Sequence, residues 1–210
     1  MSHVKQQLHS GNGKESRRAL DFYPTPKNVT KALMDFLFKE KVLDFNCSIW
    51  ECACGDGSMS DVLKEYCPDV YSSDLRDAGY GVGGVNYLQE QHPMKFEAII
   101  TNPPFNLSAG FIKKATNESR VVCMLLKSQY WHAKNRCDLF FSNPPSYVLP
   151  LTWRPDFLEH EKKAGDKKGA PTMEVAWSVW IKGDNQTKYI PLKKDEPIKI
   201  NKQNNLKLDL

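Results

Sequence analysis

An apolar run that ends in two prolines constrains the fold of this chain more than any other feature of its sequence. Residues 96–101 read FEAIIT, a nearly continuous apolar run that predicts a strand buried on both faces. Asn102, Pro103, Pro104 and Phe105 follow directly. Because proline cannot donate a hydrogen bond to a sheet ladder, the strand must stop at Asn102. We therefore expect an amide and an aromatic ring to be held rigidly at the carboxyl end of this strand.

Segments with strand patterns alternate with segments of helical periodicity along the chain. The predicted strands cover residues 47–51, 70–73, 85–88, 96–101, 121–127, 147–153 and 175–181. The predicted helices cover residues 26–40, 108–117 and 133–142, and one more begins at residue 58. This alternation predicts an α/β fold with a Rossmann-like, mostly parallel sheet. The last two strands have no helix between them and are expected to form an antiparallel hairpin at one edge.

The length of 210 residues suits one α/β domain with a sizeable core. Residues 1–20 predict a flexible basic tail and residues 186–210 a polar C-terminal tail, so we expect the domain to cover residues 21–185. The N-terminus lacks the apolar core of a signal peptide, and no apolar run approaches the roughly 20 residues of a membrane helix. These features predict a cytoplasmic protein without a membrane partner.

Charge and cysteine spacing are less specific. The net charge of +4 is compatible with nucleic-acid binding without requiring it. The six cysteines show no CxxC spacing that would indicate a zinc site. We expect them to be free and reduced, and we expect no metal.

A glycine-containing turn, ECACGDG, follows the first predicted strand, at the position where α/β sheets bind ligands. Gly55 and Gly57 would allow the backbone to approach a ligand closely, and Asp74 could accept hydrogen bonds from both hydroxyls of a ribose. A dinucleotide site would need a third glycine where Ser60 stands, and a phosphate loop would need Gly-Lys-Ser or Gly-Lys-Thr. The turn therefore favours a nucleoside without a pyrophosphate, such as S-adenosylmethionine.

Four motifs in this order resemble those of the class I amino-methyltransferases, and most closely the N6-adenine DNA methyltransferases of phage and bacterial type. They are YPTP (23–26), ECACGDG (51–57), SDL (73–75) and TNPPF (101–105). The resemblance covers residues 21–182 and implies an S-adenosylmethionine-dependent enzyme with a Rossmann-like class I methyltransferase sheet. A phage-encoded enzyme of this type would act in the host cytoplasm.

The resemblance also implies which residues bind the cofactor. The tyrosine and threonine of YPTP would help to seat its methionine end, and the glycines of the turn would line its middle. Asp74 would bind the ribose, and Leu75 would pack on the adenine. Asn86 stands where such families often have an aspartate, and its carbonyl could still bond the adenine amino group. The full set is Tyr23, Thr25, Glu51, Ala53, Gly55, Gly57, Asp74, Leu75 and Asn86.

The Asn-Pro-Pro-Phe corner has the composition needed to methylate an aromatic amine. Such an amine is a poor nucleophile because its lone pair is delocalised into the ring. The side-chain oxygen of Asn102 and the carbonyl of Pro103 could accept hydrogen bonds from its two hydrogens, and the two prolines would fix this geometry in advance. Phe105 could stack on an adenine flipped out of DNA. Cytosine-C5 methylation is disfavoured because the required Pro-Cys nucleophile is absent.

The same tripeptide occurs again at Asn143, Pro144 and Pro145. There it follows an amphipathic helical run and precedes Ser146 instead of an aromatic residue. Because no strand leads into it and no ring follows it, the second copy is predicted to be a turn.

Substrate contacts are expected after the later strands, from aromatic residues that could shape a base pocket and from cations that could contact phosphates. The candidates are Tyr130, Trp131, Arg154, Lys162, Lys163, Lys167 and Lys168. The lysines could equally form a solvated loop. No stretch is long enough for a separate target-recognition domain, which predicts a short or loosely read DNA target.

Three other functions stay open at the level of sequence. Related Asn-Pro-Pro-aromatic corners methylate RNA bases and protein glutamines, because all of these present a planar nitrogen. A catalytically inactive nucleic-acid-binding module could keep the fold without transferring a methyl group. A nicotinamide oxidoreductase is disfavoured by the serine at position 60.

Overall fold

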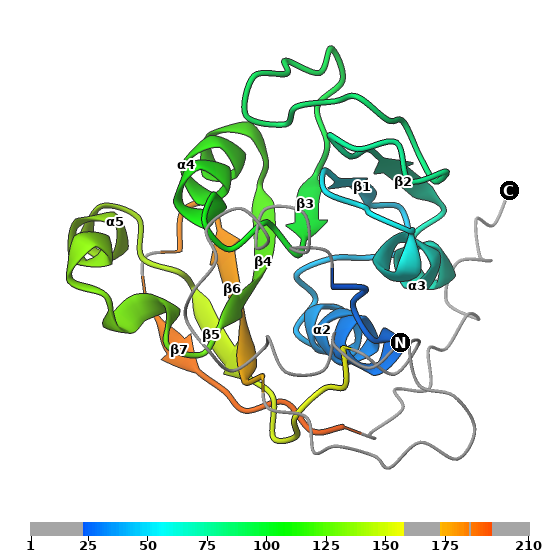
Figure 1. Ribbon diagram of the computed structural model, residues 1–210. Helices are drawn as coiled ribbons and strands as arrows, with labels where there is room; N and C mark the ends of the chain where they lie inside the picture. Colours follow the sequence, from blue (N-terminus) through cyan, green and yellow to red (C-terminus); the bar gives the residue numbers. More distant parts are fainter. Residues whose placement is uncertain (1–22, 158–172, 185, 195–210) are drawn as a thin grey trace, which may run out of the picture.

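One seven-stranded sheet organises the protein in its computed structural model, which describes residues 23–157, 173–184 and 186–194 (Figure 1). The strand order is β2-β1-β3-β4-β6-β5-β7. The strands are β1 (Ser48–Glu51), β2 (Asp69–Ser72), β3 (Ala98–Thr101), β4 (Val121–Lys127), β5 (Tyr147–Pro150), β6 (Val175–Ile181) and β7 (Lys188–Tyr189).

The pairing confirms a mostly parallel α/β sheet with antiparallel strands toward one edge. β1 is parallel to both β2 and β3, and β3 is parallel to β4. β6 runs antiparallel to β4 on one side and to β5 on the other. The predicted antiparallel pair, β5 and β6, therefore forms. Its second strand, β6, pairs with the central strand β4, and its first strand, β5, lies farther toward the edge.

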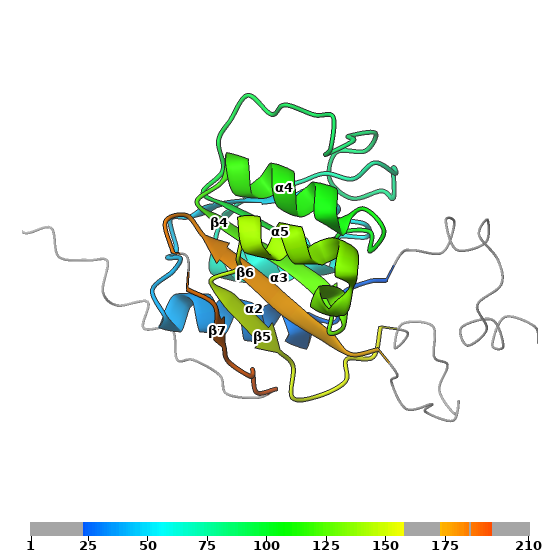
Figure 2. The ribbon, with the colours of Figure 1, turned by 90° about the vertical axis from the view of Figure 1, so that its left-hand side faces the viewer.

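Helices cover both faces of the sheet. They are α2 (Lys27–Lys39), α3 (Ser58–Tyr66), α4 (Ser108–Glu118) and α5 (Cys137–Ser142), with short 3-10 turns η1 (Tyr130–His132) and η2 (Lys134–Arg136). α2 and α3 lie on one face, and α4 and α5 lie on the other (Figures 1 and 2). None of the helices in the described ranges is both long enough and apolar enough to cross a membrane.

The central strands supply side chains to two cores, which explains their nearly continuous apolar sequences. In β4, Cys123 and Leu125 belong to the cluster that includes α2 and α3, whereas Val122 and Met124 belong to the cluster that includes α4. Alternate residues of a strand point to opposite faces, so a strand covered on both faces must be apolar at every position.

Two strand predictions need correction. Residues 85–88 form no strand; instead, Val82 makes an isolated bridge to Ser73 at the end of β2. The sheet also gains β7, to which no sequence pattern pointed. β7 pairs in parallel with β5, and its two residues are exposed, so it carries no apolar alternation.

The cysteine prediction is wrong for one pair. Cys47 and Cys67 form a disulfide, with their Cα atoms 6.0 Å apart. Cys47 immediately precedes β1 and Cys67 caps the end of α3, so only the folded strand–helix unit brings them together. The other four cysteines are free as expected, three of them buried (Cys52, Cys54 and Cys123) and one exposed (Cys137).

Candidate active site

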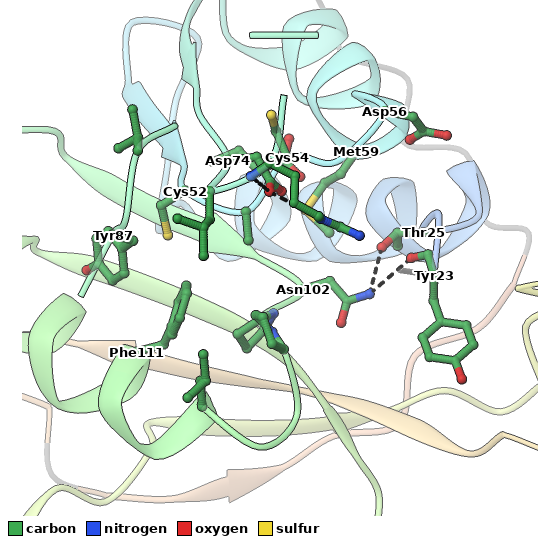
Figure 3. A pocket seen from close by; sticks show the side chains of 18 of the residues that line it. Tyr23, Thr25, Cys52, Cys54, Asp56, Met59, Asp74, Tyr87, Asn102 and Phe111 are labelled. Carbon is green, nitrogen blue, oxygen red and sulfur yellow. Dashed lines mark hydrogen bonds and ion pairs between the residues drawn. The ribbon is translucent and has the colours of Figure 1, made fainter. Parts of the chain in front are cut away.

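A cleft with a volume of about 250 Å³ opens at the carboxyl ends of β1, β2 and β3 (Figure 3). Four segments that are distant in sequence line it: the stretch before α2, the turn after β1, the segment after β2, and the corner after β3. The predicted site residues among its lining are Tyr23, Thr25, Glu51, Ala53, Asp74, Leu75, Asn86, Asn102, Pro103, Pro104 and Phe105. The fold thus brings the corner and most of the expected cofactor residues into one cavity.

The side-chain amide of Asn102 has a defined orientation. Its Nδ2 donates to the main-chain oxygen of Tyr23 at 3.4 Å and to Oγ1 of Thr25 at 3.2 Å (Figure 3). A carbonyl oxygen can only accept, so the amide nitrogen must be the atom that faces Tyr23. The Oδ1 atom is left without a hydrogen-bond partner among the described residues, on a side chain that lines the cleft.

The two prolines differ in what their carbonyls do. The carbonyl of Pro104 accepts from the backbone N–H of Leu107 at 2.8 Å and from Oγ of Ser108 at 3.3 Å, which starts α4. The carbonyl of Pro103 accepts no hydrogen bond from the described residues. The corner therefore presents two acceptors in adjacent residues, Oδ1 of Asn102 and the oxygen of Pro103.

The ring of Phe105 has an aromatic ring and a cation as neighbours. It stacks with Tyr23 at a centroid distance of 6.4 Å and an interplanar angle of 28°. The ammonium of Lys127, at the end of β4, lies 4.6 Å from the Phe105 centroid. Lys127 was not among the sequence candidates, although its position at the end of a predicted central strand could have suggested it.

Asp74 occupies the opposite part of the cleft. Its carboxylate accepts from the backbone N–H of Gly55 at 2.9 Å and from that of Arg76 at 2.8 Å, and it pairs with the Arg76 guanidinium at 3.6 Å. The side chain is buried, yet it lines the cleft. Gly55 therefore acts by orienting Asp74, and it does not itself line the cavity.

Gly57 also lies outside the lining, because the ring of Tyr80 covers it. A Cβ atom on Gly57 would lie 2.3 Å from a Tyr80 ring carbon. No sequence pattern selects Tyr80, because it stands in a glycine-rich segment, GYGVGG, without helical or strand periodicity.

Glu51 is a buried acid at the base of the cleft. Burial raises the pKa of its carboxyl to about 8, an effect that the Ser60 hydrogen bond opposes and that the nearby Asp56 and Asp74 carboxylates reinforce. The Ser60 hydroxyl bonds to Glu51 and lies 2.6 Å from the Ser72 hydroxyl. Glu51 is therefore largely protonated at neutral pH.

The three substrate candidates that the structure describes, Tyr130, Trp131 and Arg154, are not part of this lining. Tyr130 is buried against the Arg136 guanidinium, which lies 3.7 Å from its ring centroid, and Trp131 donates to Ser178 at 3.2 Å. Arg154 forms an exposed ion pair with Glu174 at 2.6 Å. The four lysines Lys162, Lys163, Lys167 and Lys168 lie outside the described residues.

Comparison with known proteins supports the fold. No protein-family profile and no curated protein sequence matches the chain. Among solved structures it is similar to a methyltransferase subunit of a type I restriction-modification system from Streptococcus thermophilus, with a TM-score of 0.62 and 13% identity over 80% of this chain and 47% of that one. It is also similar to an inferred class I S-adenosylmethionine-dependent methyltransferase from Listeria monocytogenes, with a TM-score of 0.58 and 13% identity over 90% and 69% of the two chains.

The fold is that of the class I methyltransferases. A third match, an inferred RNA methyltransferase from Pyrococcus horikoshii, has a TM-score of 0.58 and 15% identity over 83% of this chain and 93% of that one. The chain spans about half the length of the Streptococcus subunit, so the likeness there concerns the shared sheet and its helices.

Proposed function

We propose that this protein is an S-adenosylmethionine-dependent methyltransferase that modifies the exocyclic N6 amine of adenine in DNA, at a short or loosely read target. The observation that carries the proposal is the Asn102 amide, which is fixed through its nitrogen; among the described residues, neither its Oδ1 nor the carbonyl of the next residue, Pro103, accepts a hydrogen bond. Both residues line the same cleft as Asp74.

The residues of the cleft fit the cofactor better than they fit a phosphate-bearing nucleotide. Among the described residues, the carboxylates of Asp56 and Asp74 line it beside the protonated carboxyl of Glu51, and the one basic residue of that lining, Arg76, is paired with Asp74. Acidic groups favour a cation and disfavour a phosphate. When bound, S-adenosylmethionine would supply an electrophilic methyl group on a positively charged sulfur. Asp74 would accept hydrogen bonds from the ribose, and the apolar side chains of Leu75 and Val85 would contact the adenine.

The corner would act on the amine of the substrate. Oδ1 of Asn102 and the carbonyl of Pro103 would each accept one hydrogen of the –NH₂ group and draw the nitrogen toward a tetrahedral shape, with its lone pair directed at the methyl group. The acceptors are already in place, so little reorganisation is needed during the reaction. Transfer would form the N–CH₃ bond as the S–CH₃ bond of the sulfonium breaks, with a neutral thioether as the leaving group, and one of the same two hydrogens would then pass to solvent as a proton.

Phe105 and Lys127 favour a nucleic acid over a protein glutamine. A partly exposed ring beside the reacting corner offers a stacking surface for a flipped base. A lysine ammonium 4.6 Å from that ring can contact a backbone phosphate of the same nucleotide. An RNA base is the second candidate, because the corner fits any planar amine and the similar Pyrococcus protein is named as an RNA methyltransferase.

The test is a transfer assay with three substrate classes. The purified protein is incubated with methyl-labelled S-adenosylmethionine and with DNA lacking adenine methylation, with unmodified ribosomal RNA, or with release-factor protein. The products are then digested to nucleosides or amino acids. We expect label in N6-methyldeoxyadenosine, and none when Asn102→Ala replaces the wild type. Label in RNA or glutamine would redirect the proposal to those substrates, and no transfer to any of them would refute it.

A further inference from the structure

The segment that follows β2, residues 76–85 and here called the β2 loop, is anchored on α3 by one side chain. The ring of Tyr80 lies over Gly57, where an added Cβ would meet three ring carbons at 2.3–2.5 Å. The Tyr80 hydroxyl donates to Oδ1 of Asp61 at 2.9 Å and accepts from Nζ of Lys64 at 2.9 Å. Ring and hydroxyl together connect the loop to the first two turns of the helix.

The β2 loop also forms hydrogen bonds with both main-chain polar groups of Asp74. The Asp74 N–H donates to the carbonyl of Val82 at 3.0 Å, and the Asp74 carbonyl accepts from the N–H of Val85 at 3.0 Å. The N–H of Val82 bonds to Ser72 at 2.9 Å, so the loop folds back along the end of β2. Tyr80 itself does not line the cleft, whereas Asp74 does.

We propose that Tyr80 is a positioning residue for cofactor binding. By fixing the β2 loop on α3, it holds the Asp74 carboxylate where the ribose hydroxyls bind. This inference rests on the proposed function, because it takes the cleft to be a nucleoside site. A glycine is then needed at position 57 because any side chain there would collide with the Tyr80 ring. In this interpretation the second glycine of the GxG turn accommodates the ring and does not contact the cofactor.

The first test compares Tyr80→Ala and Tyr80→Phe by calorimetry with S-adenosylmethionine, which needs no knowledge of the methyl acceptor. Loss of the ring should raise the Kd about tenfold or more, because Asp74 is no longer held before binding. Tyr80→Phe keeps the ring over Gly57 and should stay within about threefold of the wild type. At saturating cofactor, kcat should change little in either variant, since the corner at Asn102 is untouched.

The second test reaches the same contact from the glycine side and leaves Tyr80 in place. Gly57→Ala introduces a Cβ into the ring, at a φ of +84°. Gly183→Ala is the matched control, because Gly183 has a φ of +90° and nothing within 4 Å of an added Cβ, so it carries backbone strain without a clash. Gly57→Ala should raise the Kd about tenfold and Gly183→Ala should leave it unchanged.

Coupling between the two positions decides the matter. In a Tyr80→Ala background, Gly57→Ala should raise the Kd by no more than about twofold, because the ring that it would strike is gone. Wild-type affinity in Tyr80→Ala, a fall in kcat with unchanged Kd, or additive effects of the two substitutions would overturn this inference alone. Failure of the wild-type protein to bind S-adenosylmethionine would overturn the proposed function.

Discussion

The chain contains the tripeptide Asn-Pro-Pro twice, and the two copies have different surroundings. The copy at Asn102 follows the buried strand β3 and opens into the cleft. The copy at Asn143 follows the short helix α5, and its side chain donates to Oγ1 of Thr116 at 3.0 Å. Both amides are anchored through nitrogen, so the tripeptide alone does not distinguish a reactive corner from a structural one.

The difference lies in the fourth residue and in what shares the cavity. Phe105 is a partly exposed ring at the rim of the cleft. Ser146 is fully buried, and its hydroxyl donates to the carbonyl of Asp184 at 3.2 Å and accepts from the N–H of Ile181 at 2.9 Å. One corner therefore faces the cleft, whereas the Ser146 hydroxyl of the other links the start of β5 to the end of β6.

The largest effect is expected from removing the amide at each corner in turn. Asn102→Ala deletes one of the two acceptors for the substrate amine and should lower kcat by about 10²–10³-fold, the range seen when one preorganised transition-state hydrogen bond is lost. Asn143→Ala should leave kcat unchanged. Steady-state methyl transfer to DNA measures both, with circular dichroism as a check of folding. Equal losses in the two variants would mean that the tripeptide has a common structural role.

The fourth residues should separate activity from stability. Phe105→Ala removes the stacking surface, worth about 1–3 kcal/mol per base, and should lower kcat/KM for nucleic acid by about 10- to 100-fold without changing cofactor affinity. Ser146→Ala removes a buried hydroxyl with two partners and should lower the free energy of unfolding by about 1–3 kcal/mol. Urea denaturation measures the free energy of unfolding and transfer kinetics measure kcat/KM for both variants. Phe105→Ala should lose activity, and Ser146→Ala should lose stability. A full-activity Phe105→Ala enzyme would exclude base stacking on this ring.

The acceptors that hold each amide form the next matched pair. Thr25→Val removes the 3.2 Å bond to Asn102, lets the amide rotate, and should lower kcat about tenfold. Thr116→Val removes the equivalent bond at Asn143 and should leave kcat unchanged. An increase in the KM for S-adenosylmethionine in Thr25→Val, with kcat preserved, would instead place Thr25 at the methionine end of the cofactor, as the sequence resemblance implies.

The smallest effect concerns stability and depends on pH. In the folded protein the pKa of Glu51 is raised from 4.5 to about 8, so the folded state holds a proton that the unfolded state releases in this interval. Stability should therefore fall as pH rises from about 4.5 through about 8. Glu51→Gln keeps the shape of the side chain but does not titrate. The melting temperature of the variant minus that of the wild type should therefore rise by several degrees between pH 5 and pH 8.5. Parallel pH profiles would show that Glu51 is already ionised.

The parts of the fold that could be predicted from sequence are those with a strong local signal. The apolar runs of β3 and β4 and the prolines at 103 and 104 locate the central strands and the corner. The motif order also places Asp74 and Asn102 at the same edge of the sheet. β7 was missed because its Lys188 and Tyr189 are exposed and polar at an edge, where neither apolar alternation nor burial is needed.

The rest depended on contacts between distant segments. The cysteines of the disulfide are 20 residues apart in sequence, and it is the packing of α3 against β1 that brings them together. Gly57 was expected to let the cofactor approach the backbone, but the ring that packs on it belongs to Tyr80, which follows a different strand. Tyr130 and Trp131 were selected for their aromatic rings and their position after a central strand, but Tyr130 is buried in the core cluster that includes α4, and Trp131 is partly buried against that cluster. A role of these two residues in substrate binding stays a prediction, as does that of Lys162, Lys163, Lys167 and Lys168, which lie outside the described residues.

The bonds from Asn102 to Tyr23 and Thr25 join segments 79 and 77 residues apart in the chain. During synthesis Tyr23 and Thr25 emerge before Asn102. Their bonds to its amide can form only when β1, β2 and β3 have assembled and brought Asn102 beside them. A fragment that contained only the Asn-Pro-Pro-Phe stretch would leave the amide free to rotate. The fixed orientation of this amide is thus a property of the assembled sheet and not of the Asn-Pro-Pro-Phe segment alone.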